Sequence, residues 1–543
     1  MVLLAVLGGL AVLGAAFAVW LFGAAASAAW RMRRVPSPKA PSIITGHLPA
    51  ILSDRAPLIL AEWAAAHGPL VRLRVLGTPM VLLSDPGEAA RVLRRGPEYI
   101  PKARQLYAAL EAGVQPQTAN LLTADDGPMW KAVRSAVAPA FSASSLKQAL
   151  PWVVDCTRRT AARIGAAGPG AELDVADAAK RITSDVMGSL LFGEDLGAVD
   201  GKPSEYLSLF NLVLEATHQR FTNPLRPAMA LWDKQARREQ WALAEHDRLL
   251  GDKVAAIRKA PPPDYTITGH LLNVVDPATG LKLSDTQLKA ELAIVFGAGF
   301  ETTSHAISWA LGALAAHPEA QARLAAELAA AGLAPSAGCP VPRDFEWSDM
   351  ARLPYLAAVI KETLRLFSPG SLGTTRLVAK PIKLCGHVVP AGVMVMVSPY
   401  VMGVQPRLFP GAEDFRPERW LHAGGAPAKG AVPAGAGDDG GADVGAGGGD
   451  QAPRAGREAP APVKGGGAVD PYPFSLGPRD CVGRALADLE LQAVLASLVG
   501  RYAWTGRAAS VAELKAGAVY HVTLQPGSGG MMLRAEPRAP AAA

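Results

Sequence analysis

The longest apolar stretch of the chain lies at its N-terminus. Residues 2–30 carry no charge and are almost entirely Leu, Val, Ala, Gly, Phe and Trp. A helix of this kind rises about 1.5 Å per residue and can span the roughly 30 Å of a bilayer core. Arg31, Arg33 and Arg34 follow directly, and the positive-inside rule places that end in the cytosol. We therefore predict a transmembrane anchor over residues 1–30.

Two other targeting segments compete with an anchor. Ala26-Ser27-Ala28 is similar to the cleavage site of a secretory signal peptide, but the apolar run is long and lacks a basic start. A plastid transit peptide would be rich in Ser and Arg instead of uniformly apolar. The prediction is a single-pass protein of the endoplasmic reticulum, in preference to a plastid membrane, with the rest of the chain in the cytosol.

Beyond the anchor, the hydrophobic pattern predicts many helices and a few short strands. Pro36, Pro38 and Pro41 predict a stiff, extended hinge over residues 31–50. Residues 70–75 and 80–83 read as a β-hairpin. Ser284 and Gln287 predict the capping box of a long apolar helix that runs to about His317. Further expected elements are a helix ending near Leu366, short strands up to about Val397, a helix over 482–499, and a hairpin over 519–533 that turns at Pro526-Gly527.

Residues 423–468 break this pattern. Gly, Ala, Pro and Asp dominate there, and no residue is aromatic. Such a stretch cannot bury enough apolar surface to offset its ordering entropy, so we predict a disordered insertion. The expected organisation is an anchor at 1–30, a hinge at 31–50 and one large domain over 51–543 that contains this insertion.

Composition excludes several classes of function. Half of the residues are hydrophobic, which is ample for a large core, and the net charge of +6 is mild. Because the basic residues are not concentrated in one patch, we expect no nucleic acid partner; anionic membrane lipid and an acidic protein partner suit this charge. The four cysteines, at widely separated positions with no CxxC, argue against a disulfide framework and a zinc site: Cys156, Cys339, Cys385 and Cys481.

One of these cysteines stands near glycines, just ahead of an apolar helix. Residues 474–483 read Phe-Ser-Leu-Gly-Pro-Arg-Asp-Cys-Val-Gly. Gly477 and Gly483 allow tight turns and the close approach of a flat macrocycle, and a helix start favours a thiolate at Cys481. Arg479 can pair with a haem propionate, and Phe474 can cover the sulfur. Because a thiolate ligand favours O–O cleavage at haem iron, the pattern predicts that Cys481 is the axial ligand of a haem.

This loop resembles the signature of the haem-thiolate monooxygenases, the cytochrome P-450 family. Three further motifs stand in the family's order, and the resemblance runs from about Pro36 to the C-terminus. It implies a mainly α-helical fold with smaller β sheets (α+β), a single large haem domain and haem b as the cofactor.

The segment Ala-Gly-Phe-Glu-Thr-Thr at 298–303 resembles the family's oxygen-activation motif. The resemblance implies that Thr302 offers its hydroxyl to the reacting oxygen while Glu301 relays protons from solvent. Gly297 and Gly299 each cost roughly 1 kcal/mol relative to Ala inside a helix, so we expect the helix to open locally and make room for dioxygen. The alternative is an ordinary apolar helix in which Thr302 bonds to the carbonyl four residues earlier.

Two further motifs imply a structural network and a cofactor anchor. Glu362 and Arg365 share one helix face, and Arg419 stands where the family has a third partner, so the resemblance implies a buried network that braces the cysteine loop. An isolated pair of this kind would instead be exposed to solvent and would contribute little to the stability of the fold. Propionate contacts are implied for Trp130, Arg134 and Arg376. Relatives commonly have a His-Arg pair where this chain has Met402-Gly403-Val404.

The function implied by the resemblance is insertion of one oxygen atom of O₂ into an apolar small molecule, such as a sterol, fatty acid, terpenoid, carotenoid or xenobiotic. The segments that would touch it, 104–123, 293–303, 368–375 and 519–523, are mostly apolar. Because the chain has neither a flavin nor a nicotinamide fingerprint, we expect electrons from an NADPH-dependent flavoprotein reductase. It would dock on a basic face near Lys131 and Arg484.

Two other functions remain open at this point. A haem-thiolate lyase or isomerase would rearrange a lipid hydroperoxide without external electrons, and the intact Glu301 and Thr302 make it the second choice. A non-catalytic haem sensor or carrier is the third, and the complete proton-delivery motif argues against it.

Overall fold

The computed structural model describes residues 30–96, 99–223, 225–336, 339–421 and 469–539, together with Gly23 and Ser27. Most of the predicted anchor and the whole predicted insertion at 423–468 lie outside these residues. Within the described ranges, no helix combines the length and the apolar character needed to cross a membrane.

Helices are the main regular structure of the described residues, as predicted. They are α2 (Leu48–Ile51), α3 (Ala56–His67), α4 (Pro86–Arg94), α5 (Pro128–Val137), α6 (Ala143–Ala166), α7 (Val175–Phe192), α8 (Glu205–Thr222), α9 (Arg226–Met229), α10 (Lys234–Lys259), α11 (Ile267–Leu271), α12 (Asp285–Ala316), α13 (Pro318–Ala330), α14 (Pro354–Leu366), α15 (Pro399–Gly403), α16 (Arg484–Arg501) and α17 (Val511–Ala516). Short 3-10 turns include η2 (Ala108–Glu111), η5 (Pro417–Trp420) and η6 (Gly477–Arg479).

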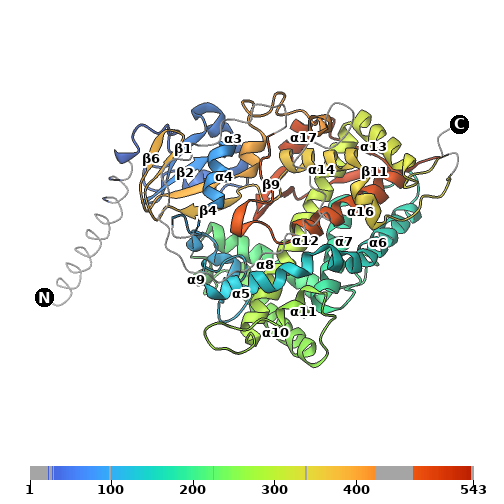
Figure 1. Ribbon diagram of the computed structural model, residues 1–543, viewed down its shortest axis with the longest axis horizontal. Helices are drawn as coiled ribbons and strands as arrows, with labels where there is room; N and C mark the ends of the chain where they lie inside the picture. The colour runs from blue at the N-terminus through green and yellow to red at the C-terminus, as the bar shows by residue number, and fades with distance from the viewer. Residues whose placement is uncertain are drawn as a thin grey trace, which may run out of the picture.

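The strands form small separate sheets. The largest has the order β1-β2-β7-β4, in which β1 (Leu70–Val75) pairs antiparallel with β2 (Thr78–Leu83), β2 pairs parallel with β7 (Met394–Val397), and β7 pairs antiparallel with β4 (Thr374–Leu377). The others are β5 (Ile382–Leu384) with β6 (His387–Val389), β9 (Ala518–His521) with β10 (Thr523–Pro526), and the order β3 (Glu172–Asp174), β11 (Met532–Pro537), β8 (Tyr502–Gly506). Figure 1 shows the largest sheet at one end of the molecule and the long helices filling the other.

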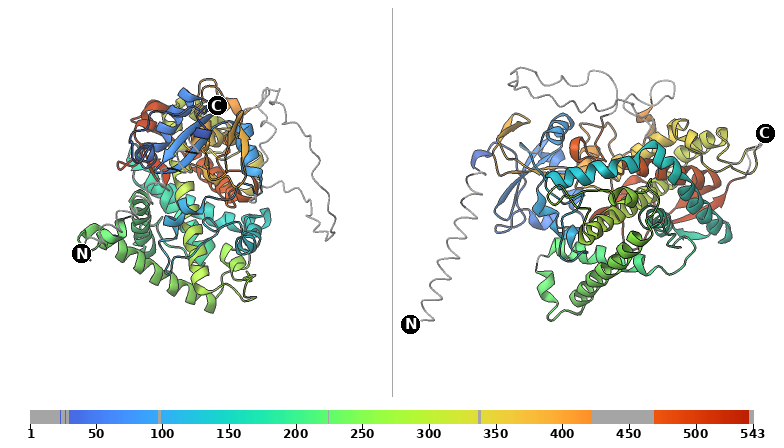
Figure 2. Two further views of the ribbon diagram at one scale, coloured as in Figure 1. Left: turned by 90° about the vertical axis from the view of Figure 1, so that its left-hand side faces the viewer. Right: turned by 60° about the horizontal axis from the view of Figure 1, so that its bottom comes forward.

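The centre of the helical part is α12, which the sequence located correctly. Ser284 accepts a hydrogen bond from the Gln287 N–H at 3.1 Å, as an N-cap does. The reciprocal bond of a capping box is not formed, because the Gln287 amide instead reaches Ala119 O at 2.9 Å and Glu291 at 2.7 Å. From Phe300 to Leu314 nearly every side chain is buried, and the helix contacts α7, α16 and β10 among others. The ribbon of α12 runs through the middle of the helical part (Figures 1 and 2). A helix buried all round needs no amphipathic stripe.

The predicted hairpin at 70–83 is confirmed, with Leu70 opposite Leu83. The predicted turn at Pro526-Gly527 is wrong. The chain reverses at Val522, which has a φ of 65°, and Thr523 pairs with His521. Pro526 lies within β10 opposite Ala518, and β11 leaves to join another sheet.

The segment predicted as a hinge lies against the first strand in this structure. Met32 and Val35 are buried in the sheet's core, and Pro36 O accepts the Arg72 N–H at 2.7 Å. His47 is buried as well, with its Nε2 3.2 Å from Pro38 O. Residues 32–47 therefore contact the domain instead of standing clear of it.

Candidate active site

The predicted ligand Cys481 lies between η6 and α16. Its N–H donates to Phe474 O at 2.9 Å, and the Gly483 N–H points at the sulfur. The thiol is open on one side and surrounded by protein on the others. That surrounding protein desolvates the group and raises the pKa of Cys481, while the Gly483 N–H and Arg134 act in the opposite direction. A bound cation would reverse the net effect, because a coordinating thiol is deprotonated outright.

The two glycines of this loop serve different purposes. Gly477 has a φ of 77°, and a Cβ there would lie 2.4 Å from Leu93 O at the end of α4. Only glycine fits, and the reason is packing against α4. At Gly483 a Cβ would meet no protein atom closer than 3.8 Å, so the protein alone does not require glycine there. Phe474 is half-buried and lies beneath the Arg484 guanidinium, 5.5 Å from it.

The 298–303 turn differs from the expectation in one respect. Helix α12 is continuous over Asp285–Ala316, so the expected local opening is absent. The two glycines are explained by neighbouring helices. A Cβ at Gly297 would lie 2.8 Å from the Phe210 ring of α8, and one at Gly299 would lie 2.6 Å from the Met187 sulfur of α7.

Extra hydroxyl donors surround the carbonyls of this turn. Thr302 donates to Ala298 O at 2.7 Å, Thr183 of α7 donates to Phe300 O at 2.9 Å, and Ser304 donates to Glu301 O at 2.9 Å. This Thr302 bond is the one expected of an ordinary apolar helix, in which the hydroxyl donates to the carbonyl four residues earlier. It does not exclude the catalytic role, because a hydroxyl that donates to a carbonyl still offers its oxygen as an acceptor.

Glu301 is buried beside this turn. Burial raises the pKa of its carboxyl to about 7, against the opposing effects of Lys180 and of a hydrogen bond from Thr523. Its proton therefore exchanges in the neutral range, which is what a group that relays protons requires.

The predicted propionate-binding arginines have protein partners in this structure. Arg479 pairs with Asp126 at 2.6 Å, donates to Ala124 O at 2.7 Å and lies 3.8 Å over the Trp130 ring. Arg134, one turn after Trp130 on α5, pairs with Asp480 at 2.5 Å. Nothing in the sequence marked Asp126 as the partner of Arg479. Asp480 lies within the cysteine motif and could have been predicted to pair with Arg134.

The same region nevertheless has an excess of buried positive charge. Arg376 on β4 is buried, and its Nε has no hydrogen-bond partner among the described residues. Burial, then Arg479 and Arg376, lower the pKa of Lys102 to about 7. Asp126 acts on all three basic groups, and Asp125 also acts on Arg479. A dianionic group would relieve their repulsion, so these residues fit the propionates of a haem whose iron binds Cys481.

The predicted acid–base network is brought together around Glu362. Arg365 donates to it at 2.8 and 2.9 Å, Arg419 at 2.9 Å, and the Trp420 indole at 2.8 Å. Arg365 also donates to Gly403 O at 2.6 Å. A Cβ at position 403 would lie 2.3 Å from Arg365 O, so packing against α14 requires glycine there.

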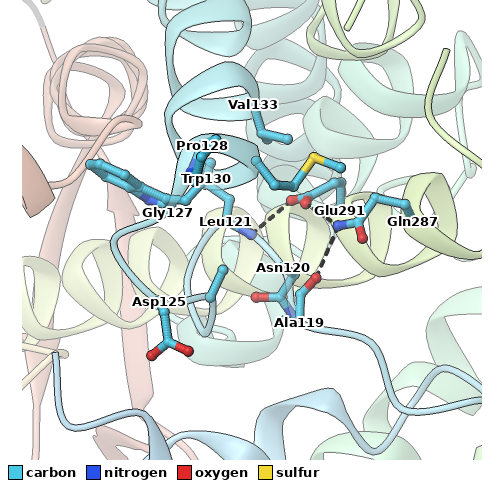
Figure 3. Close-up of a pocket in the computed structure, with 12 residues that line it drawn as sticks. Ala119, Asn120, Leu121, Asp125, Gly127, Pro128, Trp130, Val133, Gln287 and Glu291 are labelled. Atoms are coloured by element: carbon cyan, nitrogen blue, oxygen red, sulfur yellow. Dashed lines mark hydrogen bonds between the residues drawn. The ribbon is translucent and has the colours of Figure 1, made fainter. Parts of the chain in front are cut away.

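A cavity of about 240 Å³ lies between the 119–129 loop, α5 and α12 (Figure 3). Cys481 and Thr302 do not line it, but Trp130 does. Glu291 of α12 closes one side by accepting the Leu121 N–H at 2.8 Å and the Gln287 amide at 2.7 Å. Burial raises the pKa of Glu291 to about 7. This carboxyl was not identified from the sequence, because nothing in its helix pattern marks the contact with the loop.

Comparison with known proteins agrees with this geometry. The cytochrome P-450 family model matches residues 36–440 and 457–523. A cyclooctat-9-en-7-ol 5-monooxygenase of Streptomyces melanosporofaciens is 28% identical, over 84% of this chain and 87% of its own. The cytochrome P-450 monooxygenase ABA2 of Pyricularia oryzae is 26% identical, over 87% and 84%. The mitochondrial 25-hydroxyvitamin D-1 alpha hydroxylase of Mus musculus is 26% identical, over 81% and 80%.

A mainly helical fold with small sheets and an open thiol on a glycine-bounded loop define a haem-thiolate protein. The chain belongs to the cytochrome P-450 family and is a monooxygenase of that family. Such an enzyme uses haem, O₂, a small-molecule substrate and a redox partner.

Proposed function

We propose that this chain binds haem b through Cys481 and hydroxylates an apolar small molecule with electrons from an NADPH-dependent flavoprotein reductase. The observation that carries the proposal is the surroundings of Cys481. An accessible thiol has an N–H directed at its sulfur and lies in the same loop as Arg479, which shares Asp126 with the buried basic groups of Arg376 and Lys102. That combination suits a flat, dianionic cofactor with a thiolate ligand.

The residues around the site would have separate roles in oxygen activation, proton transfer and cofactor binding. Haem supplies the centre at which dioxygen is activated. Thr302 offers its hydroxyl oxygen as an acceptor and its proton as a donor on the face of α12 that stays partly open. Glu301, behind it, exchanges protons in the neutral range. Arg479 and Arg376 would hold the propionates, and the network of Glu362, Arg365 and Arg419 would brace the cysteine loop.

The substrate class is inferred from two sources. The names of two relatives specify cyclooctat-9-en-7-ol and 25-hydroxyvitamin D, both largely hydrocarbon alcohols. The segments of this chain that would face a substrate are mostly apolar. We therefore place the substrate among terpenoids, sterols and related lipids.

Membrane attachment and reductase docking belong to the same proposal. The uncharged segment 2–30 would anchor the chain in the endoplasmic reticulum, where an apolar substrate partitions and an NADPH-dependent reductase is available. Lys131 of α5 and Arg484 of α16 are exposed near the cysteine loop and would meet an acidic reductase surface.

Three measurements test the proposal. The ferrous carbon monoxide adduct should show the strongly red-shifted Soret band of a thiolate ligand, and Cys481→Ser should abolish it, since a neutral hydroxyl cannot supply that donation. Cys156→Ser, Cys339→Ser and Cys385→Ser are the matched controls and should retain the band. A screen of sterols, fatty acids, terpenoids and carotenoids by Soret shift should then identify binders.

Turnover decides between the proposed reaction and its rivals. Binders should be oxygenated only with NADPH and reductase. Rapid conversion of a lipid hydroperoxide without NADPH would instead establish a lyase or isomerase, and binding with no turnover in either assay would favour a haem carrier.

A further inference from the structure

Three buried polar side chains form a hydrogen-bonded chain between α12 and the β9–β10 hairpin. His305 Nδ1 lies 3.0 Å from Thr523 Oγ1, and Thr523 lies close enough to the Glu301 carboxyl for its hydroxyl to lower the pKa of that carboxyl by hydrogen bonding. Glu301 and His305 are one helical turn apart on α12, whereas Thr523 begins β10. The exposed fractions of Glu301, His305 and Thr523 are 6%, 0% and 5%, so water does not compete freely for these groups.

The hydrogen bonds that link His305, Thr523 and Glu301 have one consistent direction. A hydroxyl has a single proton, and the bond that lowers the pKa of Glu301 is one in which Thr523 donates to the carboxylate. The Thr523 oxygen must then accept from His305, which places the imidazole hydrogen on Nδ1. His305 Nε2 has no partner among the described residues, as expected for the bare nitrogen of a neutral ring. Burial, reinforced by Lys180, holds the pKa of His305 well below its usual range.

Several neighbours act on Glu301. Burial raises its pKa, while Lys180 of α7 and Thr523 of β10 favour the carboxylate. Glu301 in turn helps to raise the pKa of Tyr520 on β9. Glu490 of α16 faces Thr303, which lies on α12 as Glu301 does. Among the described residues, Thr523 is the one hydrogen-bond donor to the Glu301 carboxyl, and His305 orients that donor.

We propose that His305 is a positioning residue that acts through the Thr523 hydroxyl to hold the Glu301 carboxyl and to set the pH range in which it carries protons. Without the imidazole, the hydroxyl is free to rotate toward other acceptors and the carboxylate loses a fixed donor. The link to oxygen chemistry rests on the proposed function. The coupling among the three side chains rests on their contacts alone and does not depend on that function.

An infrared pH titration of the haem-loaded full chain tests the coupling directly. The protonated Glu301 carboxyl is identified as the band that disappears in Glu301→Gln. Thr523→Val removes the donor and should raise the pKa of Glu301 by about one unit, the usual worth of a hydrogen bond to a charged group. Thr523→Ser retains the hydroxyl and should leave it unchanged. His305→Leu keeps the hydroxyl but frees it, and should raise the pKa by roughly half a unit.

Two amide substitutions separate the hydrogen bond from packing. Asn places an N–H near the position of Nδ1, whereas Gln places it nearer Nε2, so His305→Asn should preserve the Glu301 titration and His305→Gln should shift it as His305→Leu does. His317 provides the matched control, because it lies just after α12 and its Nδ1 is 2.7 Å from Ala313 O. His317→Leu should leave Glu301 unchanged. An unchanged Glu301 titration in His305→Leu or His305→Gln would overturn the proposal.

Kinetics test the second half of the proposal. A proton donor works while protonated, so reductase-supported product formation should fall as the pH rises through the Glu301 pKa. His305→Leu should shift this fall in product formation to higher pH, by the same amount as it shifts the infrared titration. A pH profile that does not shift would refute a role for His305 in setting the pH range. If no substrate is oxygenated at all, the proposed function fails, and the infrared result still decides the coupling.

Discussion

A buried carboxyl that the oxygen chemistry does not use offers a quantitative test of the fold. Glu490 lies on α16, fully buried, and neither of its oxygens has a well-formed hydrogen bond, although Thr303 is close enough to lower its pKa slightly. Burial raises the pKa of Glu490 to about 8. The unfolded chain should titrate at about 4.3, so the folded protein retains a proton over roughly four pH units in which the unfolded chain has lost it.

The sign of the effect follows from this difference. Because the folded pKa is raised, the stabilisation from Glu490 is complete below the unfolded pKa and is lost as the pH rises toward about 8. The loss is about 1.4 kcal/mol per pH unit within that window. Glu490→Gln cannot titrate, so the free energy of unfolding of the natural chain minus that of the variant should fall by about 2 kcal/mol from pH 5.5 to pH 7.

Urea unfolding followed by tryptophan fluorescence across that pH range measures the difference. The comparison removes the contributions of other titrating groups, and any constant cost of placing an amide in the core appears as an offset without a slope. Glu62→Gln, at an exposed position on α3, is the control and should show no pH-dependent difference. A difference between the natural chain and Glu490→Gln that is the same at every pH would show that Glu490 is not buried as described.

The remaining predictions concern the network, the oxygen chemistry and the partner. Arg365→Leu leaves a buried carboxylate without its main partner and should lower the free energy of unfolding by about 3–5 kcal/mol, whereas Arg323→Leu breaks an exposed pair and should cost less than about 1 kcal/mol; equal urea midpoints would contradict this. Thr302→Ala should keep most NADPH consumption while product per NADPH falls and hydrogen peroxide rises, and undiminished coupling would refute its role. Reversing the charges of Lys131 and Arg484 should slow reduction by reductase at low salt, and unchanged salt dependence in stopped-flow kinetics would discard the docking face.

Much of the fold and several site residues could be read from local sequence. The capped start of α12, the 70–83 hairpin and the end of α14 depend on residues within a few positions of one another. Glu362, Arg365 and Arg419 were also predictable as one network, because the resemblance to the family's motifs implies it.

Most of the failures come from packing between segments distant in sequence, and one comes from the local turn conformation. Gly297 and Gly299 suggested an opened helix, but their purpose is contact with Phe210 and Met187 on other helices. The hairpin turn was placed at Pro526-Gly527 by turn propensity, and the structure instead puts Val522 at positive φ. Nothing near Glu301 in the sequence indicates Thr523, and therefore the buried chain with His305 was not foreseen.

The contrast between Glu301 and Glu362 shows how the fold separates a chemical carboxyl from a structural one. Glu362 accepts five hydrogen bonds, from two arginine side chains, an indole and a backbone N–H. So many donors hold both of its oxygens in fixed positions. Glu301 is also buried, but it has a single hydroxyl donor and the more distant charge of Lys180. Burial without a full set of donors is what brings its pKa to about 7, so the number of donors decides which carboxyl can move protons.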